Sequence, residues 1–105
     1  MMSNLEVINQ LVKSIVENVH PLKIILFGSA ARGELSAGSD IDVLVVMPED
    51  VHRRKIAQLL YRRITGVGLS FDIIVATPND LLKYKDNIGL IYHTVLKEGK
   101  EIYAA

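Results

Sequence analysis

The feature that most constrains this chain is a pair of apolar segments joined by a short link of mostly small and polar residues. Residues 23–28 and 40–47 are rich in Ile, Leu and Val, so each predicts a buried β-strand. The link is too short for a regular parallel crossover, which usually takes a dozen residues or more. A third apolar run at 69–76 predicts another strand, and helical patterns alternate with the strands. We therefore expect an α/β (α+β) fold, a small mixed β-sheet with helices packed on it.

Apolar residues at helical spacing place the expected helices around these strands. The helices are expected at residues 5–19, 29–32, 50–65 and 78–99, the last with a break near 87–89. Ser29 and Asp50 are the expected N-caps of the second and third helices. Gly66 and Gly68 are expected to close the third helix. Residues 102–103 are expected to form a short edge strand.

Two aspartates open the second apolar run. Asp40 and Asp42 are two positions apart, so on a strand both side chains point to the same face. Their Cα atoms would lie roughly 6.5 Å apart, which is two strand rises. Carboxylates at this spacing can converge on one Mg²⁺ or bridge two metal ions. Without a cation the two anions would repel each other at a cost in stability. The competing interpretation is a strand entry with two solvated acids.

The turn after the first strand is suited to phosphate. Gly28 lets the backbone approach a phosphate without a Cβ in the way. The Ser29 hydroxyl can donate a hydrogen bond to a phosphate oxygen, and Arg32 can pair with phosphate through two parallel hydrogen bonds. The alternative for Arg32 is an ion pair with Glu34 or Asp40.

A third acid lies within the apolar run at 69–76. Asp72 has apolar neighbours on both sides, an expensive position for a charge that lacks a partner. If its strand lies beside the strand of Asp40 and Asp42, the three carboxylates would form one cluster. The alternative is an acid that faces solvent on an outer strand.

These residues together resemble a known family. Gly28-Ser29, a spacer of ten residues and the Asp40-x-Asp42 pair are similar to the signature of the DNA polymerase beta-type nucleotidyltransferase superfamily. The variant GSAARG followed by SDID most resembles its minimal nucleotidyltransferase (MNT) branch. The resemblance covers about residues 20–76 and implies a nucleotidyltransferase fold, with residues 1–105 as a single MNT domain. It also implies that Gly28 and Ser29 hold a nucleoside triphosphate.

The resemblance further implies a reaction. Asp40 and Asp42 would bind Mg²⁺, with two ions expected, and Asp72 would help to bind metal or activate the attacking hydroxyl. ATP would be the substrate and AMP the transferred group. Larger relatives carry an added domain for the second substrate, for which this chain has no room. The implied partner is a HEPN-type ribonuclease toxin, adenylylated on a tyrosine, with this chain as its antitoxin.

Two other functions stay open at this point. A non-catalytic antitoxin or binding module would neutralise a partner by complex formation, as the high apolar content of 50% also allows. A small-molecule nucleotidyltransferase would need a pocket that a chain of this size is expected to build only as a homo-oligomer. Stoichiometry separates the first alternative from catalysis. A blocking module must be present in the same molar amount as its partner and needs no nucleotide, whereas a catalyst can inactivate a molar excess.

Composition removes several other classes. The formal net charge is zero, so no global field draws the chain to nucleic acid or to an anionic membrane, and direct nucleic-acid binding is not expected. The chain has no cysteine, which excludes disulfides and thiolate metal sites. No membrane-length apolar stretch and no P-loop or dinucleotide-binding glycine motif is present, so we expect a cytoplasmic protein. The basic segment 52–63 is either a solvated helix face or a docking surface for an acidic partner or RNA.

Overall fold

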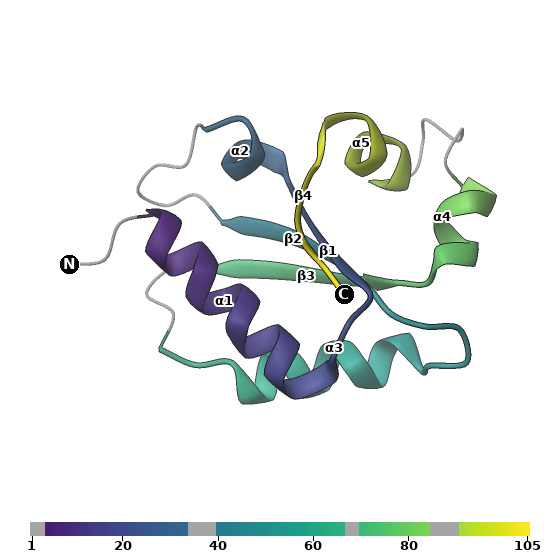
Figure 1. Cartoon of the computed structure of the whole chain (residues 1–105), viewed down its shortest axis with the longest axis horizontal. Coiled ribbons are helices and arrows are strands. Elements are labelled where there is room, and N and C mark those ends of the chain that lie inside the picture. Colours follow the sequence, from purple (N-terminus) through teal and green to yellow (C-terminus); the bar gives the residue numbers. More distant parts are fainter. Residues whose placement is uncertain (1–3, 34–39, 67–69, 85–90) are drawn as a thin grey trace.

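The computed structural model describes residues 4–33, 40–66, 70–84 and 91–105. In chain order, its elements are α1 (Asn4–Val19), β1 (Lys23–Phe27), α2 (Gly28–Ala31), β2 (Ile41–Val46), α3 (Arg53–Arg63), β3 (Phe71–Ala76), α4 (Pro78–Tyr84), α5 (Ile91–Glu98) and β4 (Lys100–Ala104). Helices alternate with strands as far as β3, as the apolar patterns predict, and two helices, α4 and α5, then precede β4 (Figure 1).

The four strands form one mixed sheet in the order β3-β2-β1-β4. β1 pairs antiparallel with both β2 and β4, whereas β2 and β3 are parallel. The antiparallel β1–β2 pair agrees with the short link between these strands, and the parallel pair is joined through α3, as a parallel connection requires. The predicted small mixed sheet is therefore confirmed.

The sheet is buried on both faces. Ile41, Val43 and Val45 of β2 point into a core cluster that α1 and α3 cover. Leu44 and Val46 point the other way, into a second cluster that includes residues of α4 and α5. Figure 1 shows α1 and α3 on one side of the sheet and α2 and α5 on the other. Burial on both sides explains why β2 is an almost continuous apolar run and not an alternating one.

Two predicted N-caps are wrong. Ser29 lies inside α2, whose cap position is Phe27, and the side chain there makes no capping hydrogen bond. α3 is capped by His52, whose ring nitrogen accepts the backbone N–H of Lys55. Asp50 cannot cap α3 because it lies in the preceding turn, with a left-handed φ of 74°. The predicted break near 87–89 and Gly68 fall outside the described residues.

The C-terminal part of the chain agrees with prediction in outline and extends it. α5 ends at Glu98, directly before Gly99, as expected. The expected edge strand at 102–103 is longer, because β4 pairs with β1 over most of its length. Within the described ranges, every helix is too short or too polar to cross a membrane.

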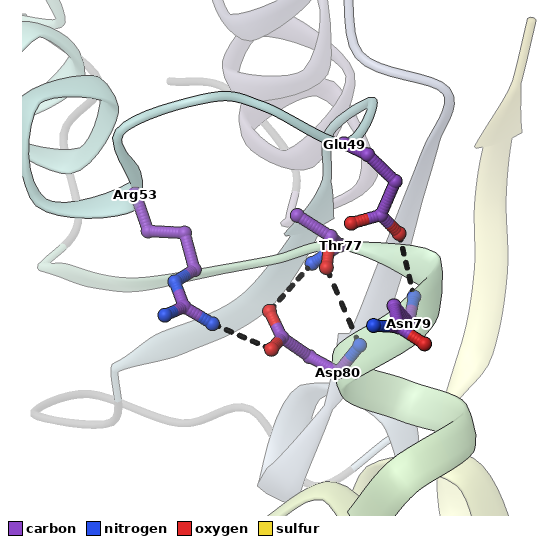
Figure 2. A network of polar contacts seen from close by, with 5 residues as sticks. All are labelled: Glu49, Arg53, Thr77, Asn79 and Asp80. Carbon is purple, nitrogen blue, oxygen red and sulfur yellow. Dashed lines mark hydrogen bonds and ion pairs between the residues drawn. The ribbon is translucent and has the colours of Figure 1, made fainter.

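A polar network holds the start of α4 to the β2–α3 connection (Figure 2). Thr77 and Asp80 form a reciprocal capping box, in which each side chain accepts the backbone N–H of the other residue. Arg53 of α3 pairs with the Asp80 carboxylate, and Glu49 accepts the backbone N–H of Asn79. Burial alone would raise the pKa of Asp80, but the hydrogen bonds and charge of Arg53 and the hydrogen bonds of Thr77 outweigh it and lower that pKa.

Candidate active site

The parallel β2–β3 pair brings two predicted site residues side by side. Asp42 and Asp72 are Cα partners in the register, and neighbouring strands lie about 4.8 Å apart. Register partners share a face of a sheet, so both carboxylates lie on the face that α4 and α5 cover further along. Asp42 is half-buried and Asp72 is exposed. The condition set by the sequence, that the strand of Asp72 neighbours the strand of Asp42, is confirmed.

Asp40 completes the acidic group at the entry to β2. Its side chain is exposed, directly before the first residue of the strand. Burial raises the pKa of Asp42, and the negative charges of Asp72 and Asp40 raise it further. The three carboxylates are therefore close enough to repel one another, which is the condition in which a bound cation is most favourable.

Gly28 presses directly against this acidic group. It follows β1, which pairs with β2 so that Phe27 lies opposite Asp42. Its φ of +71° is in the left-handed region that favours glycine. A Cβ added at Gly28 would overlap the Oδ2 atom of Asp42. The turn predicted to hold phosphate and the carboxylates predicted to hold metal are thus in contact through this one residue.

The other two predicted phosphate ligands lie in and after α2. Ser29 is half-buried in α2, and Arg32 is exposed at its C-terminal end. Because α2 has only four residues, it offers little helix dipole, and binding of an anion here depends on individual groups. Arg32 is the C-cap residue, and its backbone N–H faces the carbonyls of Gly28 and Ser29.

The chemistry of the acidic group fits a divalent cation. Its donors are carboxylate oxygens, the ligands that Mg²⁺ takes in proteins. Across the described ranges, however, no three His, Cys, Asp or Glu side chains are grouped closely enough to hold a metal ion as they stand. The pKa of Asp42 is raised first by burial and then by repulsion from Asp72 and Asp40, and this repulsion favours such separation.

Sequence reasoning missed one residue next to this site. Tyr61 of α3 accepts the backbone N–H of Ile73 with its hydroxyl, at 2.7 Å, and its ring stacks on Phe71. Both contacts flank Asp72. No sequence signal separated Tyr61 from the exposed face of α3, because its role depends on β3 lying at the outside of the sheet.

Comparison with known proteins places the chain. The sequence profile of the nucleotidyltransferase domain matches residues 8–102. A relative from Methanocaldococcus jannaschii, named "Putative protein adenylyltransferase MJ0604", is 37% identical over 81 residues, which make up 77% of each chain.

Solved structures show the same fold. One, described as "a putative nucleotidyltransferase from Sulfolobus solfataricus", has a TM-score of 0.63 and 23% identity, over 95% of this chain and 79% of that chain. A chain of the complex between tri-AMPylated Shewanella oneidensis HEPN toxin and MNT antitoxin has a TM-score of 0.60 and 19% identity, over 98% of this chain and 74% of that one. With a profile match across most of its length, the chain belongs to the nucleotidyltransferase domain family and is a nucleotidyltransferase.

Proposed function

We propose that this chain is a Mg²⁺-dependent protein adenylyltransferase, which moves AMP from ATP to a hydroxyl group, and that its acceptor is a tyrosine of a HEPN-type toxin. The observation that carries the proposal is the contact of Gly28 with Asp42, with Asp72 in register beside it. The name of the M. jannaschii relative supports protein adenylylation, and the AMPylated toxin bound to an MNT antitoxin supports the acceptor.

The reaction is an in-line displacement at the α-phosphorus. The acceptor oxygen forms a bond to this phosphorus while the bond to the bridging oxygen of the β-phosphate breaks, and pyrophosphate leaves with that electron pair. The hydroxyl proton must be removed as the new bond forms. Asp72 is the candidate to receive it, because its side chain is exposed and lies beside Asp42 in the register of β2 and β3.

Asp40, Asp42 and Asp72 are the residues that would hold the metal, with two ions expected. Bound Mg²⁺ supplies charge neutralisation for the triphosphate and lowers the pKa of the attacking hydroxyl. Asp42 is the register partner of Asp72 and lies two residues from Asp40 in the sequence. It is therefore the acid that would be able to contact both metal ions.

Gly28, Ser29 and Arg32 would hold the triphosphate. Gly28 lets the Asp42 carboxylate lie directly against the turn, because a Cβ at this position would overlap the Oδ2 atom of Asp42. The Ser29 hydroxyl and the Arg32 guanidinium would donate to phosphate oxygens at either end of α2. These residues would position the α-phosphorus near the carboxylates, so that the energy of triphosphate binding holds the substrate in the orientation needed for reaction.

The test is transfer of labelled AMP from ATP, with Mg²⁺, to a candidate HEPN protein. Asp42→Asn should abolish transfer, whereas Asp50→Asn should retain it. Asp50 is a matched control: it is exposed, lies in a turn outside the acidic group, and has a positive φ that Asn tolerates well. Full transfer by the Asp42→Asn variant would refute the assignment of the acidic group.

A non-catalytic binding module is the second candidate, and one surface favours it. An apolar groove at the far end of the sheet from the acids is lined by Leu22, Lys23, Val46, Pro78, Leu81, Leu82 and Leu96. Leu82 is 66% exposed, a high value for a large apolar side chain. The two functions separate by titration: a catalyst with ATP and Mg²⁺ inactivates a molar excess of toxin, whereas a blocking module inactivates only its own molar equivalent, with or without nucleotide.

A further inference from the structure

We propose that Tyr61 is a positioning residue for Asp72: its hydroxyl and ring fix the backbone of β3 on both sides of this carboxylate. The inference rests on the proposed function, because it takes Asp72 as a metal-binding residue. It extends that function to a residue on α3, a helix that covers the opposite face of the sheet from the acids.

β3 needs support because it is an outer strand of the described sheet. In the order β3-β2-β1-β4, β2 is the only strand of the described residues that pairs with β3. The N–H of Ile41 donates to the Ser70 carbonyl and the N–H of Met47 donates to the Ala76 carbonyl. In a parallel ladder, the backbone N–H and C=O groups of the even-numbered residues of β3 therefore point to β2. The backbone N–H and C=O groups of Phe71 and Ile73 point the other way, out of the sheet. Outward N–H groups of this kind lack a sheet partner.

Tyr61 supplies the missing partner. The outward N–H of Ile73 donates to the Tyr61 hydroxyl at 2.7 Å, a short distance for a hydrogen bond of this type. The Tyr61 ring stacks on the ring of Phe71, with centroids 5.7 Å apart and planes 7° from parallel. The two contacts fall on the residues immediately before and after Asp72, so a single side chain brackets it.

This bracket determines where the carboxylate lies. Side chains alternate along a strand, so Phe71 and Ile73 point towards α3 while Asp72 points towards the acidic group. A shift or twist of the outer strand would carry Asp72 away from Asp42, its register partner on the well-supported β2. Groups that orient metal ligands from outside typically contribute about 10- to 100-fold in metal affinity or activity. Because Tyr61 acts through the backbone, we expect the low end, about tenfold.

The experiment compares Tyr61→Phe with Tyr103→Phe. The first variant keeps the stacked ring and removes only the hydroxyl that accepts from Ile73. The second removes the same atom from a half-buried tyrosine on β4, the other outer strand of the sheet. Each protein is examined for exchange of the Ile73 amide by NMR, for Mn²⁺ affinity by titration, and for AMP transfer.

We expect Tyr61→Phe to speed exchange of the Ile73 amide, to weaken Mn²⁺ binding about tenfold, and to lower kcat with little change in KM for ATP. KM is spared because Gly28, Ser29 and Arg32 are untouched. Tyr103→Phe should match the wild type in all of these. A folded Tyr61→Phe variant with wild-type Mn²⁺ affinity and kcat overturns the inference, even if the Ile73 amide exchanges faster. If the wild type itself binds no Mn²⁺, the proposed function fails first and the inference falls with it, so the two failures are distinguishable.

Discussion

Replacing Gly28 with alanine tests the contact on which the site depends. Gly28 has a φ of +71°, and a Cβ at this position would overlap the Oδ2 atom of Asp42. The substitution therefore has two separate effects. It places a residue with a side chain in the left-handed region, and it forces the Asp42 carboxylate out of its present position.

The size of the first effect follows from the backbone. An alanine in the left-handed region costs about 1–2 kcal/mol. For a chain of this length, each kcal/mol lowers Tm by about 4–8 °C, so a fall of roughly 5–15 °C is expected. The second effect acts on the site, because the Asp42 carboxylate must rotate away from the new methyl group and so loses its present position beside Asp72. A loss of about 10- to 100-fold in Mn²⁺ affinity and in AMP transfer should follow.

Gly66→Ala separates these effects. Gly66 has nearly the same φ, +73°, but a Cβ there would meet no atom of the described residues within 4 Å. Both variants should lose similar stability in thermal melts, whereas only Gly28→Ala should lose Mn²⁺ binding and transfer. Equal melting losses combined with wild-type Mn²⁺ affinity in Gly28→Ala would show that the contact with Asp42 has no functional role.

Three further predictions concern the pKa shifts and the capping box. Because folding raises the pKa of Asp42 above its ordinary 3.8, this carboxyl favours folding most when protonated, and stability is lost as the pH rises through the folded-state pKa. Asp42→Asn should therefore have a higher Tm than the wild type at neutral pH, a gain that shrinks in acid; a lower Tm at neutral pH would contradict the assigned repulsion. Thr77→Ala removes the cap of α4 and should cost about 1 kcal/mol, or roughly 4–8 °C in Tm. Because the pKa of Asp80 is lowered, its stabilisation is present above 3.8 and lost as the pH falls through the folded-state pKa, so the difference in Tm between wild type and Asp80→Asn should narrow in acid. If the difference in Tm between the wild type and Asp80→Asn stays constant as the pH falls, the ionised carboxylate of Asp80 is not the source of this stabilisation.

Much of the fold could be predicted because it depends on local pattern. The β-branched runs marked three strands, and the two-residue spacing of Asp40 and Asp42 fixed their shared face. That β3 lies beside β2 with Asp72 opposite Asp42 depends on strand order, which one sequence does not encode locally. Tyr61 was missed for the same reason, since its partner is an outward N–H that exists only because β3 is an outer strand.

The wrong helix caps have a different cause. Asp50 is a better cap by residue preference than His52, yet the turn geometry before α3 leaves His52 in the cap position. The Thr77–Asp80 capping box carried a readable signal, a threonine followed three residues later by an acid before a helical segment. Its pairing with Arg53 could not be predicted, because those two residues are 27 positions apart.

Asp42 and Asp72 lie on strands that are held in the sheet by different numbers of neighbouring strands. In the sheet that the described residues form, Asp42 belongs to a strand with neighbours on both sides, whereas Asp72 belongs to a strand with a single neighbour. Peripheral elements open at lower free energy than the centre of a fold, so warming should detach β3 while the rest of the sheet persists. The upper temperature for catalysis would then be set by this local detachment. Substitutions that raise the melting point by strengthening α1 or β1 would leave that ceiling unchanged.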